Sequence, residues 1–151
     1  MSGLRVRGLR VTGPRGEIVR GVDLDVAPGE CVAIVGESGT GKSLTARALV
    51  GLVPTGLTAT ADALDIDGVD LRAATERQWR GVRGARVALV SQDALVSLDP
   101  LRRIGAEVAE PVRIHTPSVR GTRLRDRVRD ALTRVSLPEP ERRARQYPHE
   151  L

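Results

Sequence analysis

The stretch VGESGTGKSL, residues 35–44, combines a glycine-rich loop with the single lysine of the chain. Residues 36–43 match the pattern G-x-x-x-x-G-K-[ST]. The glycines of this pattern allow a tight turn in which successive backbone N–H groups point inward and form a nest for phosphate oxygens. A helix that follows the loop adds the positive end of its dipole at the same place. The stretch therefore predicts a strand, a loop and a helix that together bind the phosphates of a nucleotide.

Lys42 is the only lysine among the 24 basic residues of the chain, and the other 23 are arginines. Its compact ammonium on a flexible stem suits contact with the β- and γ-phosphates better than a planar guanidinium does. The hydroxyl of Ser43 is the Mg²⁺ ligand in this pattern, and Lys42 is expected to act in catalysis as well as in binding. The residues expected to hold the nucleotide are Gly36, Glu37, Ser38, Gly39, Thr40, Gly41, Lys42, Ser43 and Leu44.

Two apolar segments are expected to form buried strands of a parallel sheet. CVAIV (residues 31–35) precedes the loop, and RVALVSQ (residues 86–92) lies further along the chain. Runs without polar alternation are typical of strands covered on both faces, so Cys31 is also expected to be buried. Functional residues of an open parallel sheet lie at the C-terminal edge of its strands. Gln92 is therefore expected beside the nucleotide, where it would position a water molecule or bind Mg²⁺.

The other elements are expected as antiparallel strands first and helices afterwards. Residues 4–11 and 18–26 alternate between apolar and polar side chains, as strands with one solvated face do. Residues 63–71 (ALDIDGVDL) predict a hairpin with its turn at Asp67 and Gly68. Helices are expected from Lys42 to a stop at Pro54, across residues 74–84 around Trp79, from Ile104 to Val112, from Leu124 to Val135, and at residues 138–145.

The bulk composition bounds the partners of the chain. The 151 residues have globular proportions, with 40% hydrophobic and 28% charged side chains. The net charge of +5 raises the question of nucleic acid, but the arginines are interleaved with acids, so no nucleic-acid partner is expected. The longest apolar stretches are far shorter than the roughly 18 residues of a membrane-spanning helix, so no direct membrane insertion is expected. A single cysteine excludes an internal disulfide and is typical of a cytosolic protein.

Taken together, these motifs resemble the ATP-binding subunit of ABC transporters, in particular the oligopeptide/dipeptide/nickel importer branch. The matching stretches are VGESGTGKS, LDIDGVDL, WRGVRGARVALVSQDALVSLDPLRRIGAEVAEP and ERRARQYPHEL. The resemblance implies an α/β fold of the P-loop NTPase type, with a RecA-like core and an antiparallel β subdomain followed by an incomplete α-helical subdomain. A composition change near Asp93 places the nucleotide-binding core at residues 1–93 and the helical subdomain at residues 94–151.

The resemblance also implies ligands, partners and a location. The ligands would be ATP and Mg²⁺, and Gln92 would be the glutamine of the family's Q-loop. The partners would be membrane-spanning permease subunits, faced by residues 94 to about 115, and a second ABC ATPase subunit in a homo- or heterodimer. The chain would then be cytoplasmic and peripheral, held on the inner face of the cell membrane through the permease.

Two departures from the family's pattern qualify this function. The family stacks an early aromatic ring on adenine, but no ring lies near Thr12 or Gly13, which leaves Val11 or Val19 as a poorer apolar surface. The sequence stops at Leu151, where the family's signature begins, so the signature, the Walker B aspartate, the catalytic glutamate and the switch histidine lie outside it. We therefore expect this polypeptide to bind ATP and Mg²⁺ with little or no hydrolysis on its own.

Three functions stay open on the sequence. The first is a transport ATPase subunit that couples ATP binding and hydrolysis to solute uptake in a peptide or nickel importer. The second is a truncated or split gene product that binds ATP and Mg²⁺ at most. The third is a small P-loop kinase, which the length suits, although no arginine-bearing lid or acceptor pocket is evident after Gln92.

Overall fold

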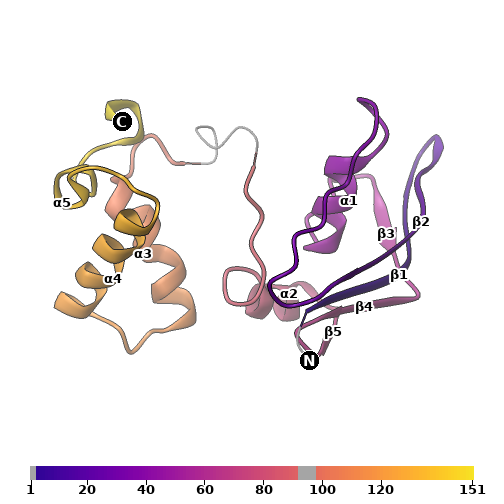
Figure 1. The fold of residues 1–151 in the computed structure, drawn as a ribbon, viewed down its shortest axis with the longest axis horizontal. Helices are drawn as coiled ribbons and strands as arrows, with labels where there is room; N and C mark the ends of the chain where they lie inside the picture. Colours follow the sequence, from indigo (N-terminus) through magenta and orange to yellow (C-terminus); the bar gives the residue numbers. More distant parts are fainter. Residues whose placement is uncertain (1–2, 92–97) are drawn as a thin grey trace. The chain divides into compact units, whose positions relative to one another are not determined.

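Five antiparallel strands form one sheet in the first part of the chain (Figure 1). The longest pairing joins β1 (Leu4–Gly13) to β2 (Gly16–Val26). On its other side, β1 pairs with β3 (Thr58–Thr60) and β4 (Ala63–Ile66), and β5 (Val69–Asp70) pairs with β4. The two alternating strands predicted from the sequence are confirmed.

The structure is a computed structural model that describes residues 3–91 and 98–151. The chain divides into two units, Met1–Leu89 and Val90–Leu151. Each unit has its own hydrophobic core, so each is described separately below.

A bulge keeps the apolar side chains of β1 on one face of the sheet. Val6 is buried before the bulge, and Leu9 and Val11 are buried after it, so the buried positions move by one residue. The register of β1 against β2 shifts between Val6 and Leu9. An extra residue in one strand of an antiparallel pair causes such a shift, and here it lets both halves of β1 face the same core.

The hairpin of β4 and β5 turns at the predicted position. Asp67 and Gly68 have φ angles of 52° and 80°, and Ile66 pairs with Val69 across the turn. Positive φ at both central residues is the geometry of a two-residue hairpin turn that suits the twist of the strands. The carboxylate of Asp65 accepts a hydrogen bond from the backbone N–H of Gly68 at 2.9 Å, which supports the turn.

Two helices complete the first unit. Helix α1 (Lys42–Leu49) packs against β1, and α2 (Glu76–Val82) begins at a capping box in which Thr75 and Gln78 bond to each other's backbone N–H groups. The core between these helices and the sheet contains Val6, Leu9, Val11, Val19, Ala48, Leu49, Leu64, Ile66, Leu71, Trp79 and Val82.

Helix α1 ends earlier than the predicted stop at Pro54. The N–H groups of Gly51 and Leu52 donate to the carbonyls of Ala48 and Arg47 at 3.1 and 2.8 Å. Gly51 has a φ of 65°, so these bonds close the helix in the glycine-terminated motif common at helix C-termini. The helix therefore ends before Gly51, and Pro54 is not what terminates it.

The described residues of the two apolar segments predicted as buried parallel strands do not form strands, so this prediction is wrong. Residues 31–35 and 88–91 are irregular and have no strand partner among the described residues. Val35 is 87% exposed and Val90 is 89% exposed, and Cys31 is exposed as well. A parallel strand exists only where neighbouring strands accept and donate its backbone hydrogen bonds. Apolar composition alone does not supply such neighbours.

The regular elements among the described residues of the second unit are all helical. These are α3 (Ile104–His115), α4 (Gly121–Arg134), α5 (Pro140–Arg143) and the 3₁₀ turn η2 (Pro148–Glu150). Ile104, Ala109, Val128 and Leu132 form its core. The three helices predicted after residue 94 are confirmed in place and order. Among the described helices, none has the length and apolar character needed to cross a membrane.

Candidate functional site

The glycine loop, residues 36–41, leads directly into the N-terminus of α1. All of it except Gly41 is exposed, and Gly41 is the N-cap residue in a left-handed conformation, with φ 91° and ψ 5°. Within the part of the chain that the structure describes, no side chain caps this helix. The N–H groups of the first turn have no acceptor inside the helix, and they carry the positive end of its dipole. The helix start is therefore free to receive an anion.

The ammonium of Lys42 is held at this loop. Its Nζ donates hydrogen bonds to the carbonyl oxygens of Gly36 at 2.8 Å and Glu37 at 2.6 Å. The hydroxyl of Thr40 donates to the same carbonyl of Glu37 at 2.9 Å, which closes the loop on itself. The ammonium of the chain's one lysine thus lies beside the uncapped helix start, and both features attract phosphate oxygens.

Thr45 anchors the first turn of α1, and the sequence reasoning did not single it out. It is buried, and both its hydroxyl and its backbone N–H donate to the carbonyl of Gly41, at 3.0 and 2.7 Å. Its sequence signal is a threonine in the first turn of the predicted helix, because threonine hydroxyls in helices can bond to the carbonyl four residues earlier. These two hydrogen bonds fix the orientation of the last peptide of the glycine loop.

Ser43 lies exposed on the first turn of α1, next to Lys42. No group of three or more His, Cys, Asp or Glu side chains that could hold a metal ion occurs in residues 3–91 or 98–151. Mg²⁺ usually keeps several waters and is held by few protein oxygens together with substrate phosphates. A single hydroxyl beside a phosphate site fits Mg²⁺ when it arrives with a nucleotide.

The apolar surface beside the loop differs from the predicted one. Val11 and Val19 are 0% and 4% exposed, so they are core residues and offer no surface to a base. Ile18, in contrast, is 43% exposed. A Cβ added to Gly41 would lie 4.0 Å from Cγ2 of Ile18, which places this side chain at the end of the glycine loop. A shallow pocket of about 240 Å³ adjoins it, lined by Gly13, Pro14, Arg15, Gly16, Glu17 and Ile18.

Gln92, predicted to position water or Mg²⁺, lies outside the described residues. The structure therefore brings together the loop, Lys42 and Ser43, and it supplies Thr45 and Ile18 as further members of the site.

A family model described as "ABC transporter" matches residues 19–151. The chain belongs to the ABC transporter family. The match starts in β2 and covers the glycine loop, both helices of the first unit and the whole helical unit. The P-loop NTPase class predicted from residues 36–43 follows from this membership, and the antiparallel sheet with helices is consistent with it.

Curated relatives within this family carry names of peptide transport proteins. The chain is 38% identical over 130 residues to the dipeptide transport ATP-binding protein DppD of Escherichia coli strain K12, covering 86% of this chain and 39% of DppD. It is 38% identical over 133 residues to the oligopeptide transport ATP-binding protein OppD of Mycobacterium tuberculosis strain H37Rv, covering 88% of this chain and 22% of OppD. The alignments thus span well under half the length of these ABC proteins.

Proposed function

We propose that this chain binds ATP with Mg²⁺ and is the nucleotide-binding part of the ATP-binding subunit of a peptide-type ABC importer. The observation that carries the proposal is the uncapped start of α1 with the ammonium of Lys42 held at the adjoining loop. Membership of the ABC transporter family supports this ligand and counts against the small kinase.

Each group of the site has a proposed task. The backbone N–H groups of the glycine loop and of the first turn of α1 bind phosphate oxygens, and Lys42 neutralises their charge. Ser43 would contribute one oxygen to Mg²⁺, and the ion would supply positive charge that screens the phosphates. Gln92 would complete this site from the segment after residue 91. The ammonium of Lys42, the amide of Gln92 and the hydroxyl of Ser43 can bind phosphate and Mg²⁺, but none of them is a base that removes a proton from water. These groups therefore explain binding, and hydrolysis requires a further general base.

The proposed solute and partners come from the relatives. DppD and OppD are named for dipeptide and oligopeptide transport, so we propose a peptide as the solute. The proposed partners are membrane-spanning permease subunits and a second ATP-binding subunit, and the proposed location is the cytoplasmic face of the membrane. The proposed division of labour assigns the nucleotide to residues 1–93 and the permease contact to residues 94 to about 115.

The Ser43→Ala variant tests the nucleotide and metal assignment. Loss of one Mg²⁺ ligand is expected to weaken binding of ATP in the presence of Mg²⁺ by roughly tenfold, about 1.4 kcal/mol. Binding of ATP in the presence of EDTA should change little, because Ser43 then has no metal to hold. Isothermal titration calorimetry of both conditions, with the exposed Ser118→Ala in the second unit as control, measures the difference. A wild-type chain that binds no ATP in either condition would refute the proposed function.

The Ile18→Tyr variant tests whether the base lies on the surface beside the glycine loop. An aromatic ring adds a stacking platform worth roughly 1–3 kcal/mol for a base, so ATP affinity is expected to rise at least about fivefold. Tripolyphosphate has no base, and its affinity should stay the same in this variant. Ile18→Ser serves as the opposite control and should weaken ATP alone. Equal gains for ATP and tripolyphosphate would show that the base lies elsewhere.

A further inference from the structure

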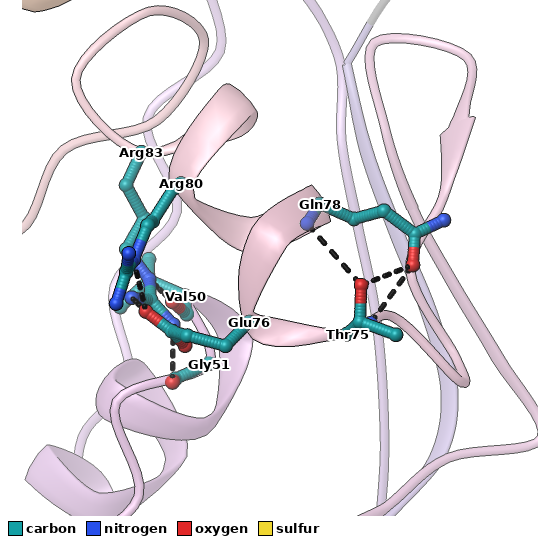
Figure 2. A network of polar contacts seen from close by, with 7 residues as sticks. All are labelled: Val50, Gly51, Thr75, Glu76, Gln78, Arg80 and Arg83. Carbon is teal, nitrogen blue, oxygen red and sulfur yellow. Dashed lines mark hydrogen bonds and ion pairs between the residues drawn. The ribbon is translucent and has the colours of Figure 1, made fainter.

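The C-terminal end of α1, opposite the glycine loop, is held by Arg83, the residue that ends α2 (Figure 2). Its Nε donates to the carbonyl oxygen of Val50 at 2.8 Å, and its Nη2 donates to that of Gly51 at 2.7 Å. Carbonyl groups at the end of a helix have no partner within it, and a cation there also complements the negative end of the dipole. One guanidinium thus satisfies two successive carbonyls just beyond the last turn of α1.

A carboxylate on α2 fixes the other side of the same guanidinium. Nη1 and Nη2 of Arg83 lie 2.9 and 3.1 Å from Oε1 and Oε2 of Glu76 (Figure 2). The hydrogen bond from Arg83 is the main reason that the pKa of Glu76 lies below its usual value, so this carboxylate is charged at neutral pH. Its negative charge balances the positive charge of the guanidinium, and the two parallel hydrogen bonds orient the guanidinium plane toward the end of α1.

Arg80 offers a direct comparison, because it also contacts Glu76 but does not reach α1. Its Nε lies 3.4 Å from Oε1 of Glu76, and its side chain is 77% exposed. The side chain of Arg83 is only 21% exposed. The two arginines share one carboxylate, and among the described residues only Arg83 also bonds to the end of α1.

Trp79 packs into the same junction. The Cζ of Arg83 lies 5.4 Å from the centre of its ring, and the ring approaches Gly51 so closely that a Cβ on this glycine would lie 2.6 Å from Cδ2. The guanidinium therefore has an aromatic neighbour, a carboxylate and two carbonyls around it. Only a planar group with several N–H donors meets all of them, and a lysine ammonium does not.

We infer that Arg83 is a positioning residue for nucleotide binding, which fixes α1 at its C-terminal end so that the helix start and the glycine loop keep the geometry that binds phosphate. This inference rests on the function proposed above. Helix α1 has eight residues, so it is about 12 Å long and moves as one rigid element. A displacement at Val50 and Gly51 is therefore passed to Gly41 and Lys42 at the other end.

The test uses Arg83→Lys, which keeps the charge and loses the fork, and Arg80→Gln as the matched control. Amide hydrogen exchange of residues 50–52 in the nucleotide-free chain reports on the end of α1. Titration with ATP and Mg²⁺, at a temperature where circular dichroism shows each variant folded, reports on the site. Arg83→Lys is expected to speed exchange at residues 50–52 and to weaken ATP binding about five- to tenfold. Arg80→Gln is expected to change neither quantity more than about twofold.

The outcomes separate positioning from general stability. A role in stability alone would lower the melting temperature of Arg83→Lys and leave the ATP affinity of the folded chain unchanged, and this result would overturn the inference. Equal weakening by Arg80→Gln would overturn it too, because Arg80 does not reach α1. A wild-type chain that binds no ATP would refute the proposed function, and this failure is recognised because it precedes any comparison of variants. If Arg83→Lys does not fold, the amide exchange of residues 50–52 is measured in Arg83→Gln and in Glu76→Gln instead. Unchanged exchange in both variants would reject the inference that Arg83 fixes the end of α1.

Discussion

Replacement of Lys42 by alanine is expected to abolish binding of ATP and Mg²⁺ while leaving the fold in place. The ammonium contacts only the loop carbonyls of Gly36 and Glu37 among the described residues, so its removal takes nothing from either core. It does remove the one side-chain cation at the glycine loop. Charge-assisted hydrogen bonds contribute about 1.5–3 kcal/mol each, so an affinity loss of roughly 100-fold or more is expected. Calorimetric titration with ATP and Mg²⁺ measures it.

Lys42→Arg is the informative control for this variant. It keeps the positive charge, and arginine is the cation that the rest of the chain uses everywhere. A planar guanidinium cannot replace a compact ammonium between loop and phosphates, so Lys42→Arg is expected to recover only part of the lost affinity. If Lys42→Ala bound ATP as tightly as the wild type, with unchanged circular dichroism, the phosphate assignment of the glycine loop would be wrong.

Replacement of Gly51 by alanine is expected to cause the largest loss of stability. An added Cβ would lie 2.6 Å from Cδ2 and 2.8 Å from Nε1 of the Trp79 ring, in the core of the first unit. Gly51 also has a φ of 65°, which costs a residue with a Cβ about 1–2 kcal/mol. Overpacking of a core adds about 1–3 kcal/mol, so the free energy of unfolding should fall by about 2–5 kcal/mol. Urea unfolding followed by the fluorescence of Trp79, the single tryptophan, measures this loss.

Gly56→Ala separates the two contributions. Gly56 has a similar φ of 86°, but nothing lies within 4 Å of the Cβ that alanine would add. Its replacement should therefore cost only the conformational part, about 1–2 kcal/mol. Equal losses in the two variants would mean that the clash of the added Cβ with Trp79 costs no stability.

Features that depend on neighbours in the sequence were predictable from it. Alternating side chains identified β1 and β2, the Asp67-Gly68 pair identified the hairpin turn, and helical spacing identified α3 and α4. The glycine loop and Lys42 were recognisable for the same reason, because dihedral preferences and short-range hydrogen bonds determine a tight turn followed by a helix.

Features that depend on distant parts of the chain were not predictable from the sequence. Residues 31–35 have the apolar composition of a buried strand, yet they form none, because strand formation needs a partner that composition does not specify. Ile18 and Val19 are adjacent and similar in the sequence, and only the packing of the sheet buries one and exposes the other.

The two ends of α1 show where this division falls. Its start follows from eight consecutive residues, whose pattern already specifies an uncapped helix N-terminus with a lysine beside it. Its end is held by Arg83, whose guanidinium bonds to carbonyls 32 and 33 residues away. No local pattern distinguishes Arg83 from Arg80, because both lie in the same arginine-rich stretch. Only the folded chain selects between them, since it places the end of α2 beside Val50 and Gly51, where Arg83 bonds to the carbonyls while Arg80 stays exposed.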